Sequence, residues 1–157
     1  MILGERMMIE QMLIVDQGGI PFYSKKFKNS AHDVDPSLLG GLISAIDSMG
    51  AQLFQKKIAT IKFGEESFHS AGESLSKIVF INKDLFHDDK HIFFVFFCSG
   101  DHSLKVLREI TTSVFIEVKS FLRAPSSDMN KIQQKVDHIL ETRFQTILGL
   151  EGGSRRW

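Results

Sequence analysis

Residues 11–27 read QMLIVDQGGIPFYSKKF and decide the fold. The segment 11–16 is apolar at neighbouring positions, which is typical of a strand covered on both faces. The glycine pair at 18–19 then supplies the backbone freedom that a tight hairpin needs. The segment 20–27 is the expected partner strand. Because Pro21 has no N–H to donate and lysines discourage further pairing, we expect this second strand at an edge of the sheet, with the first strand inside it.

A helix is predicted directly after the hairpin. Asp35 has the chemistry of an N-cap, and Pro36 suits the first helical position. Apolar residues then recur at intervals of three and four residues, as in an amphipathic helix of about five turns. They are Leu38, Leu42, Ile46, Met49 and Leu53.

The same helix carries a second stripe at helical spacing, made of small residues: Ser37, Gly41, Ser44 and Ser48. Small side chains let another backbone approach closely. Tight packing on the protein's own sheet is the simpler interpretation of this stripe. Contact with a partner is the alternative.

Three further strands are predicted at 57–63, 76–81 and 91–99, with an extension of the first to residue 70 as an alternative. Residues 92–98 are apolar at every position, so both faces of that strand must be covered by helices. A phenylalanine-rich strand of low charge would be an aggregation hazard at an edge. We therefore expect it at the centre of the sheet.

Two helices are predicted to complete the fold, at 103–123 and at 127–148. Each keeps one apolar face at helical spacing. Pro125 follows the first helix, and Gly149 is the expected stop of the second. We expect a single domain over residues 1–150 and a flexible tail over 151–157.

Composition limits the function. The chain has 157 residues, of which 43% are apolar and 24% charged, the size and mix of one globular domain. Nineteen basic and nineteen acidic residues leave no net charge, which disfavours a nucleic-acid binder. The single cysteine, Cys98, excludes an internal disulfide. No segment approaches the roughly 20 apolar residues of a membrane span, and no signal peptide is evident, so we expect a cytoplasmic protein without a transmembrane segment.

The familiar catalytic and nucleotide-binding motifs are absent. His87 to His91, HDDKH, fits a hairpin loop better than a metal site. Cys98 with His102 fits core packing better than a catalytic pair, and His69 fits a half-buried strand position better than a general base. Lysines 25, 26 and 28 fit protection of an edge strand better than nucleic-acid binding. The sequence therefore predicts no enzyme and no catalytic, cofactor-binding or metal site.

Two segments carry a resemblance to a known family. They are residues 12–22, MLIVDQGGIPF, and residues 35–46, DPSLLGGLISAI. With the order of elements that follows, they resemble the opening hairpin and first helix of a longin domain, in the longin/roadblock superfamily, and most of all stand-alone archaeal longin-like proteins. The resemblance covers about residues 8 to 148. It implies a profilin-like α+β fold, β-β-α-β-β-β-α-α, with a five-stranded antiparallel sheet in the order 2-1-5-4-3, one helix on one face and two on the other.

The family resemblance also implies a function. Longin and roadblock domains are non-catalytic platforms that pair with themselves or with relatives and bind or regulate small Ras-like GTPases in vesicle trafficking or signalling. We therefore expect a homodimer or a heterodimer with a longin/roadblock protein, a small Ras-like GTPase as partner, no cofactor, no nucleic acid, and at most peripheral membrane association through partners. Under this hypothesis the interface is formed by Ser37, Gly41, Ser44 and Ser48.

A small-molecule sensor of the PAS or GAF type is the alternative function. Such domains also place helices around an antiparallel sheet, and 14 phenylalanines could line a pocket. Sensors of this kind usually have several short helices where residues 35–54 predict one continuous helix. An unrecognised enzyme is the third possibility, because the geometry of a site cannot be judged from sequence.

Overall fold

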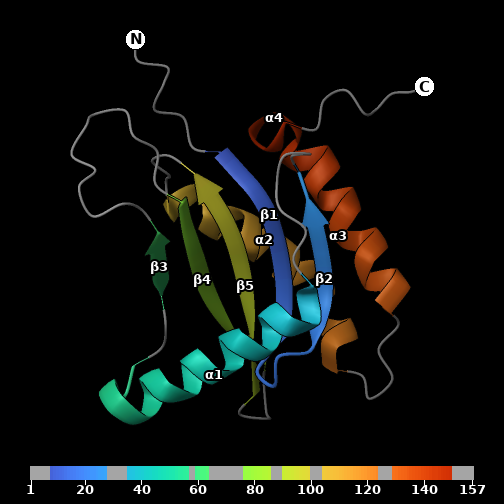
Figure 1. Ribbon diagram of the computed structural model, residues 1–157. Helices are drawn as coiled ribbons and strands as arrows, with labels where there is room; N and C mark the ends of the chain where they lie inside the picture. The colour runs from blue at the N-terminus through green and yellow to red at the C-terminus, as the bar shows by residue number, and fades with distance from the viewer. Residues whose placement is uncertain are drawn as a thin grey trace, which may run out of the picture.

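The computed structural model of the protein describes residues 8–27, 35–56, 59–63, 76–85, 90–99, 104–123 and 129–149, which form five strands and four helices (Figure 1). In chain order these are β1 (Met8–Asp16), β2 (Pro21–Lys26), α1 (Pro36–Phe54), β3 (Thr60–Phe63), β4 (Ser76–Leu85), β5 (Lys90–Ser99), α2 (Leu104–Arg123), α3 (Met129–Arg143) and α4 (Gln145–Leu148).

The strands form one antiparallel sheet in the order β2-β1-β5-β4-β3. Helix α1 crosses one face of the sheet, and α2 and α3 cover the other (Figure 1). This confirms the predicted α+β fold and the order 2-1-5-4-3. It also confirms that the strand containing Pro21 lies at an edge, although a register shift between Ile14 and Val15 accompanies the proline.

Strand β5 lies at the centre of the sheet, between β1 and β4, as predicted. Every residue from Ile92 to Phe96 is fully buried. Alternation along the strand sends Phe93 and Val95 toward α1, and Phe94 and Phe96 toward α2 and α3. Covering both faces removes these phenylalanines from water, the environment in which their apolar surface is most costly.

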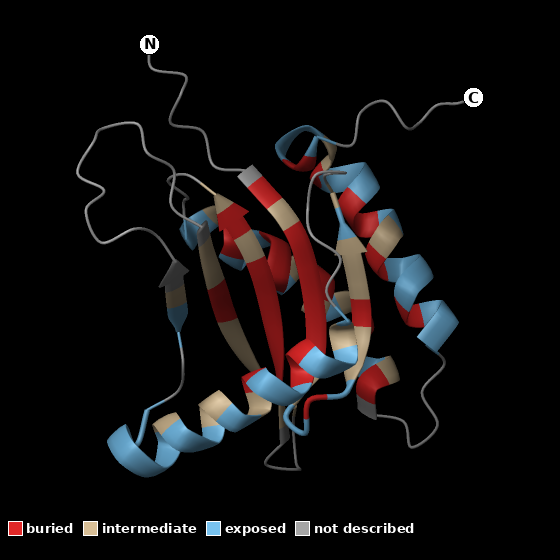
Figure 2. Ribbon diagram, in the orientation of Figure 1, coloured by how far each residue is buried: buried red, intermediate tan, exposed pale blue. Residues whose placement is uncertain are grey.

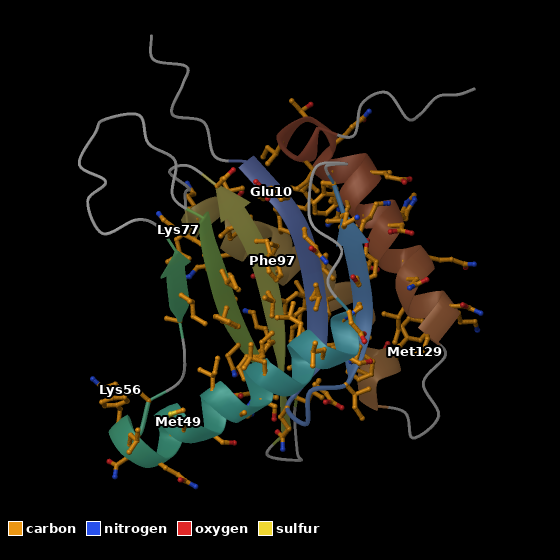
Figure 3. The ribbon with its side chains drawn as sticks, in the orientation of Figure 1. Glu10, Met49, Lys56, Lys77, Phe97 and Met129 are labelled. Carbon is orange, nitrogen blue, oxygen red and sulfur yellow. The ribbon has the colours of Figure 1, made fainter. Side chains whose placement is uncertain are left out.

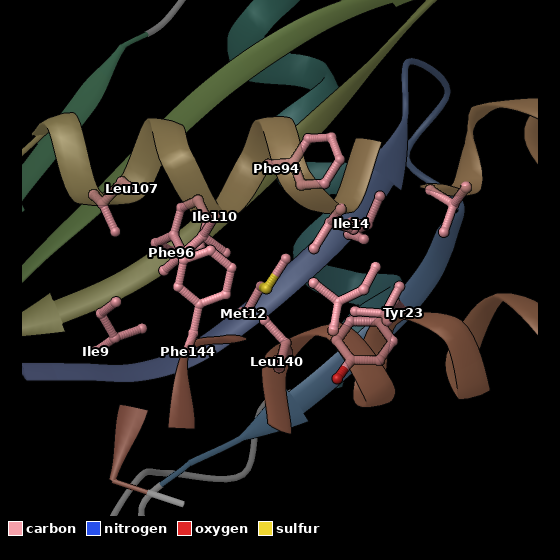
Figure 4. Close-up of a cluster of buried hydrophobic side chains, with 14 of the residues drawn as sticks. Ile9, Met12, Ile14, Tyr23, Phe94, Phe96, Leu107, Ile110, Leu140 and Phe144 are labelled. Carbon is pink, nitrogen blue, oxygen red and sulfur yellow. The ribbon is translucent and has the colours of Figure 1, made fainter. Parts of the chain in front are cut away.

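The larger core lies between the sheet and helices α2, α3 and α4 (Figure 4). Met12 and Phe96 from the sheet pack there with Ile110 of α2 and Leu140 of α3. A polar tether adds to this packing, because the Tyr23 hydroxyl donates a hydrogen bond to Asp137 of α3 at 2.6 Å.

The turn between β1 and β2 is organised by Asp16. Its carboxylate Oδ1 accepts hydrogen bonds from the backbone N–H groups of Gly18 and Ile20, each at 2.9 Å. Of the two turn glycines only Gly19 has a positive φ, at 92°. Gly19 is therefore the position at which the turn requires glycine.

The last predicted helix differs from the structure. It is divided into α3 and α4 by Phe144, whose φ of −125° and ψ of 21° are not helical. Phe144 is buried in the larger core beside Ile9 and Phe96 (Figure 4). The change of direction also brings Leu148 into that core, so burial of two apolar side chains offsets the interruption of the helix.

Candidate interaction surface on helix α1

Helix α1 begins and ends with well-defined caps. The Asp35 carboxylate accepts a hydrogen bond from the backbone N–H of Ser37 at 3.0 Å, and Pro36 occupies the first turn. At the other end Gln55 adopts a left-handed conformation, with φ of 58°, and its N–H caps the last turn. The predicted continuous helix is therefore confirmed.

Only a short part of α1 is buried. Leu39, Gly40 and Ile43 are its buried residues, and Figure 2 shows this burial confined to the first half of the helix. The second half extends past the centre of the sheet toward the β3 side (Figures 1 and 3). Helix α1 thus rests on the sheet by few apolar contacts.

Contact with the sheet is closest where α1 crosses the β1–β2 turn. A Cβ atom on Gly40 would collide with the carbonyl oxygen of Gly19, and a Cβ on Gly19 would lie 2.7 Å from the carbonyl oxygen of Gly40. Two backbones therefore meet here without side chains between them. This close approach decides which side of α1 faces the sheet.

Four of the five apolar residues that the sequence showed at helical spacing are exposed, and the fifth, Ile46, is half-buried. Exposed fractions are 72% for Leu38, 55% for Leu42, 53% for Met49 and 65% for Leu53. Together with exposed Ala45 they follow one another at intervals of four, three, four and four residues. We call Leu38, Leu42, Ala45, Met49 and Leu53 the apolar stripe. Soluble proteins seldom expose large apolar residues in a row, so such a patch is a candidate contact surface.

The small-residue stripe lies on the other flank of α1. Ser37, Gly41 and Ser48 are exposed, so the expectation that they pack on the protein's own sheet is wrong. The glycine that makes the close contact is Gly40, one position earlier. Ser44 is half-buried, and its hydroxyl donates a hydrogen bond to the carbonyl oxygen of Gln17 at 2.8 Å. The prediction that these four residues form an interface stays a prediction.

A polar group lies beneath α1 and helps to position it. Asp47 Oδ2 is 3.7 Å from His91 Nε2 of β5, and each of the two side chains is 17% exposed. The amide oxygen of Gln17 accepts a hydrogen bond from the backbone N–H of His91 at 3.0 Å. Gln17 therefore links the turn, α1 and the start of β5, through its backbone carbonyl and its side chain.

The described residues contain no group of three or more His, Cys, Asp or Glu side chains placed to hold a metal ion. His87 to Asp89, His69 and His102 lie outside the described residues. Cys98 is buried, and burial raises the pKa of its thiol to about 12, so it is a poor nucleophile as expected. Burial and a hydrogen bond to Asp137 raise the pKa of Tyr23 well above its ordinary range, which suits a structural hydroxyl.

The sensor alternative predicted a pocket lined by phenylalanines. Phe93, Phe94 and Phe96 are instead fully buried against other side chains of the two cores. A groove of about 510 Å³ does lie among the described residues, but it is formed by α2 and α3, and Phe121 is the one phenylalanine among its described lining residues. No observation on the described residues favours the sensor.

Helix α1 is long and apolar enough to cross a membrane by length and composition, contrary to the expectation above, and 17% of its apolar window is buried. Core helices of soluble proteins and signal sequences meet the same criterion. In this structure α1 lies across the sheet, with Gly40 in close contact with Gly19 and the Ser44 hydroxyl hydrogen-bonded to Gln17.

Comparisons with known proteins give similarity to solved structures. No protein-family model matches the chain, and no curated protein matches it. Among solved structures, the chain is similar to the gliding protein MglB from Thermus thermophilus, with 11% sequence identity and a TM-score of 0.39. The similarity covers 59% of this chain and 61% of that one, so the chain spans about three fifths of the structure it matches.

Proposed function

We propose that this protein is a non-catalytic interaction platform of the cytoplasm. It pairs through α1 with a second copy of itself or with a related longin or roadblock chain, and the pair binds or regulates a small Ras-like GTPase. The observation that supports pairing through α1 is the exposed apolar stripe. The GTPase as partner rests on the resemblance of the hairpin, the helix and the strand order to longin domains.

The energy available from the stripe is of the size that a weak dimer needs. Full burial of a leucine or methionine side chain is worth about 1.5–3 kcal/mol. The four large residues of the stripe are between 53% and 72% exposed, so covering all of them in two copies would yield about 7–15 kcal/mol. Association costs about 4–15 kcal/mol in lost freedom. The two ranges overlap, so the pairing is weak and is favourable only when the two helices pack closely.

The spacing of the residues in the apolar stripe is compatible with symmetric pairing to a second copy of the chain. A two-fold axis near Ala45 would place Leu38 opposite Leu53 of the second copy and Leu42 opposite Met49 of the second copy. Such self-complementarity is what a symmetric interface requires. Ala45 and its neighbours Gly41 and Ser48 are small, which permits a close helix crossing at the centre. Asp47, the single charged residue of α1, is turned toward His91 instead of the surface.

The test of pairing is the molar mass in solution, measured by light scattering after size-exclusion chromatography. We expect the wild type to become a dimer as the protein concentration is raised to about 100 μM. We expect Leu42→Glu and Met49→Glu to be monomers over the same range, with unchanged circular dichroism spectra. Ile116→Glu is the matched control, because Ile116 of α2 is also exposed, at 59%, but lies on the other side of the sheet. It should remain a dimer.

A wild type that stays monomeric, or a dimer that survives both α1 substitutions, would show that α1 does not mediate self-pairing. Binding of the wild type to phospholipid vesicles, lost in Leu42→Glu, would instead assign the stripe to a membrane surface.

The GTPase is tested separately, by pull-down from native lysate in the presence of GDP or a non-hydrolysable GTP analogue. Any GTPase or longin/roadblock protein recovered is then purified and titrated against the wild type and Leu42→Glu. A nucleotide-dependent affinity supports the proposal. The absence of any GTPase, with a small molecule released on denaturation, would turn the assignment to the sensor.

A further inference from the structure

We propose a second docking site on the protein, a groove between α2 and α3 that binds an acidic peptide segment of a partner protein. The groove has a volume of about 510 Å³. Because α2 and α3 cover the face of the sheet opposite α1 (Figure 1), a partner in this groove would leave the apolar stripe free.

The groove has a cationic rim. Lys131, Lys135 and Arg143, all from one flank of α3, line it, together with the imidazole of His138. Among the described residues that line the groove, Glu117 of α2 is the one carboxylate. Since the whole chain carries no net charge, three cations against one carboxylate form a local excess of positive charge. From Lys131 to Arg143 the row extends about 18 Å along α3, the length of a helix of about twelve residues.

The floor of the groove is apolar and suits a peptide better than a nucleic acid. Ile139 is 4% exposed, and Phe121 is half-buried beside it. The Lys135 ammonium already lies 5.8 Å from the centre of the Phe121 ring, so a base that stacked on this face of the ring would have to displace it. An apolar side chain of a peptide can cover the floor while its carboxylates reach the rim.

The ion pair between Lys135 and Glu117 leaves the rim accessible to a partner. Lys135 Nζ is 4.0 Å from Glu117 Oε1, and both side chains remain more than a third exposed. Ion pairs of this kind contribute little to stability. A partner's carboxylate can therefore compete for Lys135 without a large cost to the fold.

The direct test is fluorescence anisotropy with two labelled helical peptides of about fourteen residues. One has leucines on one face and glutamates on the other, and the second has glutamine in place of every glutamate. We expect the wild type to bind the glutamate peptide about tenfold more tightly, and that binding to weaken about tenfold between roughly 0.05 and 0.5 M salt.

The site is located with two matched double variants that change the net charge equally. Lys135→Glu with Arg143→Glu reverses the rim, and Lys105→Glu with Arg108→Glu reverses two exposed cations of α2 outside the groove. The first should weaken binding about tenfold, and the second should leave it unchanged, with both melting as the wild type does.

An equal affinity for the two peptides, or an equal loss of affinity in the two double variants, would overturn the proposal. Tighter binding of a single-stranded oligouridylate than of the glutamate peptide would assign the groove to nucleic acid instead. The salt dependence needs no substitution, so the proposal stays testable even if the rim variant fails to fold.

Discussion

Replacing Gly40 with alanine tests the close contact between α1 and the β1–β2 turn. A Cβ at this position would collide with the carbonyl oxygen of Gly19, and neither group is a flexible side-chain end that could turn away. The helix and the turn must therefore move apart. That movement would expose part of Leu39 and Ile43, the only two apolar side chains of α1 that are buried.

The magnitude follows from opposing effects. Alanine in place of glycine gains about 0.8–1 kcal/mol of helix propensity. Overpacking costs about 1–3 kcal/mol, and partial exposure of two side chains that are each worth about 1.5–3 kcal/mol when buried adds to that cost. We expect Gly40→Ala to lower the free energy of unfolding by about 2 kcal/mol overall.

Gly41→Ala is the matched control. It lies one residue away in the same helix, and a Cβ there meets nothing within 4 Å, so it should gain about 0.8–1 kcal/mol. The two variants should therefore melt about 6–12 °C apart, measured by circular dichroism at a protein concentration too low for pairing. If Gly40→Ala proved as stable as Gly41→Ala, the backbone contact between α1 and the turn would be refuted.

Further predictions concern the tether on α3, the buried thiol and the small-residue stripe. Tyr23→Phe should lower the free energy of unfolding by about 1.5–3 kcal/mol in urea titrations, because it removes a 2.6 Å hydrogen bond to the Asp137 carboxylate. Burial first, and then Asp137, raise the pKa of Tyr23, so the stability it contributes is present below about pH 10 and is lost as the pH rises further. Since Tyr23 is the sole tyrosine, tyrosinate absorbance should appear only together with unfolding, and an earlier appearance would contradict this reasoning. The Cys98 thiol, with its pKa raised to about 12, should react with an aromatic disulfide reagent only after denaturation; prompt reaction of the native protein at pH 8 would mean that the thiol is accessible. Ser48→Arg should abolish pairing without loss of stability, whereas Ser44→Arg should also destabilise the monomer, since it removes a hydrogen bond to the hairpin turn; a stable dimer of Ser48→Arg would exclude that flank from the interface.

The elements and their order could be predicted because their signals are local. The hairpin is specified by an apolar run, a glycine pair and Pro21, and the central strand by an apolar residue at every position from 92 to 98. Each signal concerns residues that are neighbours in the chain. The break at Phe144 was missed because its cause is tertiary: the helical pattern continues through the position, and burial against Ile9 and Phe96 from distant strands decides the outcome.

The four residues predicted from the sequence and the apolar stripe of the structure lie on the same helix but on different flanks. Periodicity identifies the apolar residues of a helix, yet it does not say which of them meets the sheet. Helix α1 has apolar residues on two flanks, Leu39 with Ile43 and Leu38 with Leu42. The adjacent glycines 40 and 41 carried the signal for the side that faces the sheet. Only Gly40, which faces Gly19, needs to lack a side chain.

The contacts of α1 with the sheet and the β1–β2 turn also explain how its apolar stripe can be exposed and still have a defined orientation. The contact at Gly40 fixes the rotation of the helix, Ser44 ties it to Gln17, and Asp47 lies against His91, so three consecutive turns are oriented from below. A helix that is already oriented loses less freedom when a partner covers it, which leaves more of the apolar energy for association. The same contacts make pairing depend on the hairpin: a variant that displaces α1 at Gly40 should lose self-association even though every residue of the stripe is intact.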